Sequence, residues 1–267
     1  FAVVRVIIPC VVKLTVVLHQ HWMVITHCGV GQANPPPDDP TFIFAGCMGI
    51  GFLFAEKMLV EGNLIDHLGA MLDDTGNPVV IVDPIYPTGI YGQNSFQTTI
   101  SGNSVSELQT ANGGQQMAGI ALMGGNTAVQ TDWVGCIVSG NRLEAGGCEY
   151  GIHVGIKNPA APSPFEVVSI TENVITGGKG SLYNVGIYVE ATESGSFAGA
   201  ISGNQCSDFV QQGIYLHGQE NAAGDQAQRF GDIQISDNNL HVASSVFGLS
   251  TAIQVQGTCN PATGGRL

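Results

Sequence analysis

Residues 168–189 read V-S-I-T-E-N-V-I-T-G-G-K-G-S-L-Y-N-V-G-I-Y-V, and similar phrases occur before and after them. The phrase joins an alternating apolar run, an asparagine, a second apolar step, a glycine-rich turn and Gly-Ile. Its asparagine recurs as Asn63, Asn103, Asn141, Asn173, Asn204 and Asn238. Its isoleucine recurs as Ile50, Ile90, Ile120, Ile152, Ile187 and Ile214, with Ala252-Ile253 as the last copy. Repetition every 27 to 40 residues, counted between these isoleucines, is typical of a solenoid.

Positions around the asparagine keep their character in every copy. Three residues before it stand β-branched side chains, namely Val60, Ile100, Val138, Ile170, Ile201 and Ile235. Two residues after it stand apolar ones, namely Ile65, Val105, Leu143, Ile175, Cys206 and Leu240. Two residues after each isoleucine the position is also apolar, with Gly92 as the exception. Alternation with period 2 places these residues on one face of a strand.

A single repeat of this kind has an apolar face that it cannot bury alone. Stacked repeats bury that face in a continuous core, and their strands then pair in parallel about 4.8 Å apart. We expect the asparagine to adopt a left-handed φ at a bend and to form a ladder with its counterparts above and below. We expect the glycine before each isoleucine to let the backbone turn a tight corner.

The alternation I-x-x-N-x-I followed by G-I-x-V resembles the repeat of right-handed parallel β-helix proteins of the pectate-lyase-like kind. The resemblance covers about residues 41–256 and implies an all-β, right-handed parallel β-helix of about seven coils. It implies no particular function, because this fold hosts lyases, glycoside hydrolases, epimerases, phage tailspikes, adhesins and inert structural proteins.

The segments on either side of these repeats differ from them. Residues 1–40 are interpreted as a β-rich N-terminal cap or degenerate first coils with a Pro-rich loop, N-P-P-P-D-D-P at 34–40. The apolar residues 1–18 are interrupted by Arg5, Pro9 and Lys13, which argues against a membrane span. Residues 257–267 are expected to be a C-terminal tail. A helix over 43–72 is the alternative, and we reject it because the repeat register fits that segment.

Composition excludes several classes of partner. The net charge is −13, with 8 basic against 21 acidic residues, which argues against binding to nucleic acid or to a polyanion. The seven cysteines show no C-x-x-C or Cys/His spacing, so no metal site is expected. We expect Cys136 and Cys206 to be buried in the core. A disulfide between Cys136 and Cys148 is left open.

Candidate binding residues lie on the outward positions of the strands. The residue after Gly-Ile is His153, Tyr188 and Tyr215 in three successive copies, and two residues further on come Glu190 and His217. Aromatic faces beside polar groups suit the apolar face and the hydroxyls of a sugar ring. Aromatic residues on neighbouring rungs also stabilise a sheet by packing on each other, with no ligand. Both interpretations remain open at this point.

Catalytic motifs of the resembled family are missing. Lyases of this kind need acidic calcium ligands and a base, whereas Arg142, Lys157, Lys179 and Arg229 fall on different repeats. Asn-Thr-Asp, Gly-His-Gly, Arg-Ile-Lys and Asp-Pro-His-Asp motifs are absent, and we interpret the acidic pairs Asp38-Asp39 and Asp73-Asp74 and the dipeptide Asp83-Pro84 as turns. Glu190 with Glu220 or Asp225 is a candidate carboxylate pair. No cofactor motif occurs.

These observations predict a non-enzymatic β-helix protein at an extracellular, cell or virion surface, with a structural, adhesive or glycan-binding role. A polysaccharide lyase or glycoside hydrolase acting on an extracellular glycan is the alternative. Because an open solenoid end exposes unpaired strand edges, we also expect self-association into a homo-oligomer, fibre or virion assembly.

Overall fold

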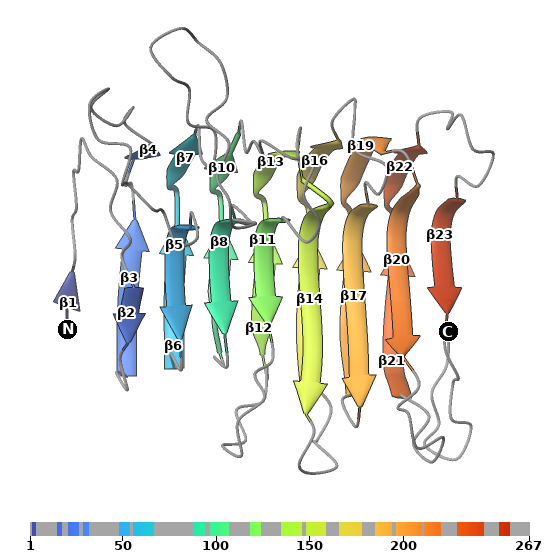
Figure 1. Cartoon of the computed structure of the whole chain (residues 1–267), viewed down its shortest axis with the longest axis horizontal. Coiled ribbons are helices and arrows are strands. Elements are labelled where there is room, and N and C mark those ends of the chain that lie inside the picture. Colours follow the sequence, from blue (N-terminus) through green and yellow to red (C-terminus); the bar gives the residue numbers. More distant parts are fainter. Residues whose placement is uncertain are drawn as a thin grey trace, which may run out of the picture.

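The computed structural model describes residues 2–3, 15–17, 21–26, 29–31, 48–53, 56–66, 88–93, 97–106, 118–123, 135–145, 148–158, 166–177, 185–193, 196–209, 211–219, 229–242 and 251–256. Every regular element in these ranges is a β-strand. The strands form three parallel sheets that run the length of the molecule (Figure 1). The protein is a parallel β-solenoid, as the repeat predicts.

The three sheets are named A, B and C, and their strands are given in spatial order. Sheet A holds β1 (Ala2–Val3), β3 (His21–Thr26), β6 (Glu56–Glu61), β9 (Thr99–Ser101), β12 (Cys136–Ser139), β15 (Glu166–Thr171), β18 (Ser196–Ser202) and β21 (Arg229–Ser236). Sheet B holds β2 (Thr15–Val17), β5 (Met48–Leu53), β8 (Thr88–Gln93), β11 (Ala118–Met123), β14 (Tyr150–Asn158), β17 (Val185–Glu193), β20 (Gln212–Gln219) and β23 (Thr251–Gln256). Sheet C holds β4 (Gly29–Gly31), β7 (Leu64–Asp66), β10 (Ser104–Val105), β13 (Arg142–Ala145), β16 (Val174–Gly177), β19 (Gln205–Phe209) and β22 (Asn239–Val242).

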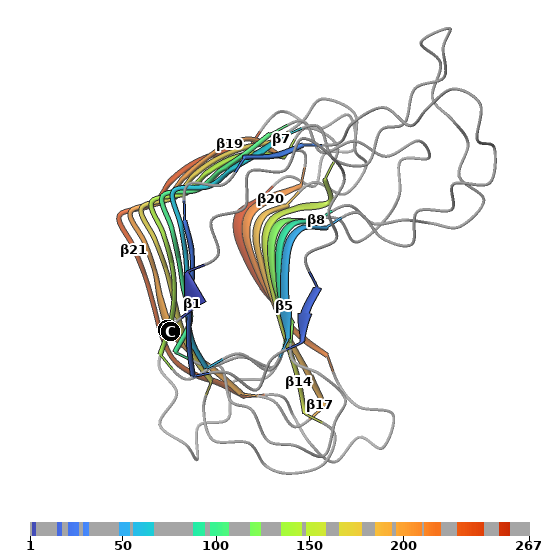
Figure 2. The same cartoon turned by 90° about the vertical axis from the view of Figure 1, so that its left-hand side faces the viewer.

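Each coil of the chain visits sheet B, then sheet A, then sheet C. Viewed along the axis, the strands of each sheet superpose and three walls enclose the interior (Figure 2). The isoleucines of the Gly-Ile phrase pair with one another from Ile50 on β5 to Ile253 on β23, so the predicted register is confirmed. Met48–Leu53, Glu56–Glu61 and Leu64–Asp66 are strands, so the helical alternative for 43–72 is wrong wherever the structure describes this segment.

The core consists of the inward columns that the sequence predicts. Val138, Ile170 and Ile201 before the asparagine are fully buried, as are Ile152 and Ile187 of the Gly-Ile phrase. Gly92, the exception in its column, has a packing reason. A Cβ at Gly92 would lie 2.5 Å from the ring of Phe52, so the phenyl group of the preceding coil fills the space that the glycine leaves.

The asparagines form a continuous ladder at the corner between sheets A and C. The main-chain N–H and the Nδ2 of Asn141 both donate to Oδ1 of Asn173, at 3.0 and 2.9 Å. The same Nδ2 donates to the Ile100 carbonyl of the preceding coil at 3.0 Å. This pattern recurs from rung to rung between Asn63 and Asn238, so the predicted ladder is confirmed.

The expectation that the asparagine of each bend has a left-handed φ is wrong. The left-handed φ belongs to the residue before each asparagine: +62° at Gly102, +57° at Glu172 and +57° at Asp237. The asparagine itself is therefore selected for its amide and not for its backbone freedom.

The expectation that the glycines before isoleucine turn a tight corner is also wrong. Glycine is required at these positions because neighbouring coils leave no room for a Cβ atom. A Cβ at Gly151 would lie 2.3 Å from Cγ2 of Ile175 and 2.6 Å from the carbonyl oxygen of Gly186. Gly186 and Gly213 are crowded in the same way by the next coil and by a side chain of sheet C. None of these three has a positive φ, so they allow close packing of successive coils.

The predictions for the cysteines and for the two terminal segments have the following outcomes. Cys136 and Cys206 are buried as expected, and Cys136 and Cys148 are both buried thiols, so the disulfide alternative is wrong. Burial raises the pKa of the Cys206 thiol to about 12. Strands β2, β3 and β4 extend the three sheets ahead of β5. The Pro-rich loop at 34–40 and the tail at 257–267 lie outside the described residues. No helix in the described ranges could span a membrane.

Candidate functional site

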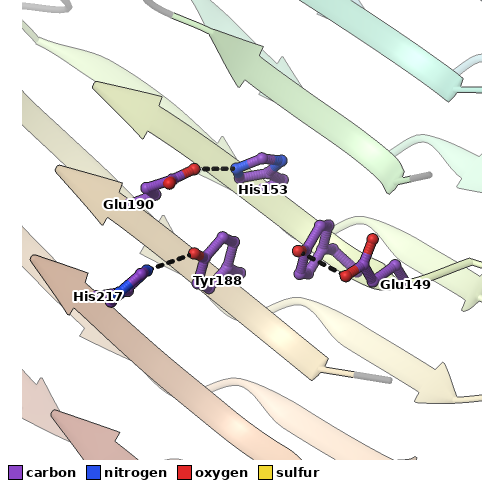
Figure 3. Close-up of polar contacts among 6 residues, drawn as sticks. Glu149, His153, Tyr188, Glu190 and His217 are labelled. Carbon is purple, nitrogen blue, oxygen red and sulfur yellow. Dashed lines mark hydrogen bonds and ion pairs between the residues drawn. The ribbon is translucent and has the colours of Figure 1, made fainter. Parts of the chain in front are cut away.

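The five candidate residues of the sequence come from three neighbouring strands of sheet B. His153 lies on β14, Tyr188 and Glu190 on β17, and Tyr215 and His217 on β20. Strand pairing places Tyr188 between His153 and Tyr215, and places Glu190 beside His217. The structure therefore brings all five together on the outer face of sheet B. Figure 3 shows four of them, His153, Tyr188, Glu190 and His217.

Tyr150 joins this cluster although the sequence pattern gave it no outward position. Period 2 puts Tyr150 on the same side as Ile152, which is fully buried in the core. At Gly151, however, a Cβ would also point at the core residue Ile175, so two successive residues face inward and the alternation is broken. Tyr150 consequently lies on the outer face. The repeated glycine at this position was the signal that the interior is crowded there.

The aromatic rings pack on each other across three coils. Tyr150 and Tyr188 are stacked, with centroids 4.6 Å apart and an interplanar angle of 10°. Tyr215 lies on β20, the opposite neighbour of β17 from β14, and its ring centroid is 5.2 Å from that of Tyr188. The ring centroids of Tyr215 and His217 are 5.3 Å apart. We call Tyr150, His153, Tyr188, Tyr215 and His217 the aromatic patch. Ring packing of this kind stabilises neighbouring strands whether or not a ligand binds.

Burial divides the patch into a base and a rim. Tyr188 and His153 are each only 7% exposed, so they support the patch and offer little surface to a ligand. Tyr150, Tyr215 and His217 are half-buried, as is Glu190. Glu149, which directly precedes β14 and was not predicted, is half-buried as well. A ligand approaching this face would therefore meet the rim residues.

Polar contacts link the rings to the carboxylates. The Tyr150 hydroxyl donates to Glu149 Oε1 at 2.8 Å, and the Tyr188 hydroxyl shares a 2.8 Å hydrogen bond with His217 Nδ1 (Figure 3). The Tyr215 hydroxyl donates to Gln256 Oε1 on β23 at 2.6 Å. His153 Nε2 faces Glu190 Oε2 at 3.6 Å, which is beyond hydrogen-bond length, and this buried nitrogen has no hydrogen-bond partner.

The tyrosines are held in their neutral form. Burial raises the pKa of Tyr150 and of Tyr188 well above the usual phenol range, and the negative charges of Glu149 and Glu190 raise both further. Burial and then Glu190 also raise the pKa of Tyr215. Together with Glu149 and Glu190, the patch therefore presents neutral phenols, imidazoles and carboxylates, a set of groups that can both donate hydrogen bonds to hydroxyls and accept them.

The basic residues that a lyase would use lie, where the structure describes them, on three different sheets. Arg142 lies on sheet C, 3.7 Å from Glu144, while Lys157 is on sheet B and Arg229 on sheet A. Among the residues that the structure describes, no group of three or more His, Cys, Asp or Glu side chains could hold a metal ion.

The remaining charged candidates of the sequence are one lysine and several acidic residues. Lys179, Asp38-Asp39, Asp73-Asp74, Asp83-Pro84, Glu220 and Asp225 lie outside the described residues. The further carboxylate that the structure sets against the tyrosines is Glu149, which accepts the Tyr150 hydroxyl.

The chain was compared with protein-family models, curated proteins and solved structures. No protein-family model, curated protein or solved structure matches the chain.

Proposed function

We propose that this protein is a non-enzymatic β-solenoid of an extracellular, cell or virion surface, which binds a glycan through the rim of its aromatic patch. The observation that supports it is the combination of half-buried tyrosines with carboxylate and imidazole groups on one rigid sheet. A sugar offers an apolar face to an aromatic ring and hydroxyls to the polar groups around it.

Tyr215 is the ring that the proposal relies on most. Tyr188 is buried, with Tyr150 stacked on it and the tilted ring of Tyr215 5.2 Å away, so it offers little surface to a ligand. The next residue in the column after Tyr215 is Gln254, which brings no further ring. Among the described strands, Tyr215 is thus the last aromatic group of its column, and it is half-buried, with Glu190 and His217 on the strand positions beside it.

A binding experiment with a matched control tests the proposal. A glycan array would identify a ligand, and titration calorimetry would follow it with Tyr215→Ala and Tyr91→Ala variants. Tyr91 occupies the same outward column two strands before His153, outside the patch, and is half-buried too. We expect Tyr215→Ala to weaken binding by roughly ten- to a hundred-fold, since an aromatic contact and its buried area contribute about 1.5–3 kcal/mol. Equal binding by both variants and the parent protein would place the ligand elsewhere.

A second candidate function follows from the two carboxylates. Glu149 accepts a hydrogen bond from Tyr150, and Glu190 Oε2 lies 3.6 Å from His153 Nε2, so both carboxylates adjoin rings of the aromatic patch. Paired carboxylates are the groups with which glycoside hydrolases act. This candidate predicts new reducing ends from a bound glycan, abolished in Glu190→Gln and in Glu149→Gln. Binding without any cleavage, in the parent protein and in both variants, would leave the non-enzymatic proposal standing alone.

A further inference from the structure

One buried nitrogen of the aromatic patch makes no hydrogen bond. His153 is only 7% exposed, and its Nε2 is buried without a hydrogen-bond partner. Oε2 of Glu190 faces this nitrogen at 3.6 Å (Figure 3). That distance is longer than an N–H···O hydrogen bond, which measures about 2.7–3.2 Å. Because buried polar groups in proteins nearly always have a partner, a buried imidazole nitrogen without one indicates a place for a ligand.

The space beside this nitrogen lies over Gly155 and is bordered by three strands. Met123 on β11, Gly155 on β14 and Glu190 on β17 are successive register partners on the outer face of sheet B. A Cβ at Gly155 would lie 2.9 Å from Sδ of Met123 and 3.5 Å from Nε2 of His153. The glycine therefore leaves room in which a thioether, an imidazole and a carboxylate meet.

These three groups are all metal ligands. Imidazole suits copper, zinc, iron and nickel, whereas the thioether is a soft ligand that favours copper. Two ligand atoms that are each about 2.0–2.2 Å from one metal ion lie roughly 3.3–3.6 Å apart at a tetrahedral angle. The 3.6 Å between His153 Nε2 and Glu190 Oε2 fits this arrangement. Since its third ligand is a methionine, the set is distinct from a cluster of His, Cys, Asp and Glu side chains, of which the described residues hold none fit for a metal.

Access, charge and rigidity also favour a bound cation. Met123 and Glu190 are half-buried, so an ion can reach them from solvent. The net charge of −13 attracts cations to the protein. The ring of His153 lies 4.7 Å from that of Tyr150 and 5.0 Å from that of Tyr188, measured between centroids. Packing between these rings fixes the direction of the imidazole before any ion binds.

We propose that His153 Nε2, Glu190 Oε2 and Met123 Sδ bind a single Cu²⁺ ion on the outer face of sheet B. The neutral imidazole carries its proton on Nδ1 and gives the lone pair of Nε2 to the ion. Glu190 supplies a negative charge, and Met123 supplies the soft ligand that favours copper. Water fills the remaining coordination positions. This site goes beyond the proposed glycan binding and does not depend on it.

A copper titration of the full chain, without any glycan, tests the proposal. Equilibrium dialysis against Cu²⁺ would be done with free glycine present, because glycine removes ions that surface histidines hold loosely. Electron paramagnetic resonance would report the imidazole nitrogens bound to the ion, and absorption spectra would report a sulfur-to-copper band. Circular dichroism would establish that each variant is folded.

Three variants and two matched controls separate this site from other copper binding. The variants remove one ligand each and are His153→Gln, Glu190→Gln and Met123→Leu. The first control is His241→Gln, since His241 is an exposed histidine of sheet C that faces Asp208 at 3.9 Å. The second control is Met58→Leu, which changes a methionine buried in the core.

We expect the parent protein and both controls to bind one Cu²⁺ per chain through one imidazole nitrogen. His153→Gln should weaken binding by roughly a hundred-fold or more, because even the outer partners of metal ligands contribute about 10–100-fold. Met123→Leu should weaken it by roughly ten-fold and remove the sulfur-to-copper band. If His153→Gln does not fold, Glu190→Gln preserves the side-chain shape and should also weaken binding.

Three results would overturn the proposal. The first is a parent protein that holds no stoichiometric copper in the presence of glycine. The second is an affinity that Glu190→Gln leaves unchanged, or that His241→Gln lowers as much as His153→Gln does. The third is an equal effect of Met123→Leu and Met58→Leu on the affinity and on the absorption band.

Discussion

The asparagine corner and the aromatic patch are both columns of side chains stacked along the coils, but they differ in how far they repeat. The corner occurs in every coil from Asn63 to Asn238, and its inner rungs are buried with their amides hydrogen-bonded. The aromatic patch spans only β14, β17 and β20, and its rim is half-exposed. A feature that recurs in all coils maintains the fold, whereas one confined to three coils is free to serve a specific role.

The largest expected loss of stability comes from removing an asparagine in the middle of the ladder. Asn173→Ala would remove the acceptor of two Asn141 donors and the donor to the Val138 carbonyl, all in a fully buried place. Each buried group left without a partner costs about 1–3 kcal/mol, so we expect a loss of roughly 3–5 kcal/mol. Urea unfolding would measure it.

Asn238→Ala is the control for that measurement. The same types of bond are lost at the last rung, where water reaches the half-buried groups, so the cost should be about 1 kcal/mol. Equal losses for the two variants would show that the ladder does not act through burial.

A smaller effect is expected at the glycines that bring the coils together. Gly151→Ala would push a methyl group against Ile175 and against the Gly186 carbonyl, and backbone cannot yield as a flexible side chain does. Overpacking of this kind costs about 1–3 kcal/mol.

Gly102→Ala is the matched comparison for Gly151→Ala, because at Gly102 only the backbone conformation disfavours alanine. Its φ is +62° and its nearest neighbour is 4.0 Å away, so strain of about 1–2 kcal/mol is the only cost. If Gly102→Ala proves the more costly in thermal unfolding, the crowding at Gly151 costs less than we expect and this prediction is wrong.

The smallest effect concerns the patch itself and depends on pH. A raised pKa means that the folded state holds the phenol proton more tightly than the unfolded chain does. The corresponding stability is complete below the ordinary phenol pKa of about 10 and is lost as pH rises above it. We therefore expect the protein to lose stability in alkali.

Tyr188→Phe should make that alkaline loss shallower, because one titrating group is removed. Near neutral pH the same variant should cost about 0.5–1.5 kcal/mol through the lost bond to His217. Melting temperatures between pH 7 and about pH 11 would check both. An unchanged alkaline slope would mean that Tyr188 is not responsible, and Tyr150→Phe would then be the next variant to measure.

Sequence periodicity predicted most of the fold and only part of the site. The inward columns, the ladder and the alignment of His153, Tyr188 and Tyr215 all follow from spacing, because a solenoid repeats one local geometry in each coil. The burial of Tyr188 does not follow, since it results from Tyr150 stacking on it. Glu149 was missed for the same reason: its place beside Tyr150 depends on a local break in the alternation.

What the sequence determined by itself is therefore the order and register of the coils, because alternation and the recurring asparagine are local properties of the chain. Only the tertiary structure decided which groups crowd, stack or open to solvent. Gly151 is needed because Gly186 of the next coil lies against it, and Tyr188 is buried where Tyr150 of the preceding coil stacks on it. Both are contacts between coils, and the spacing of residues within one coil does not encode them.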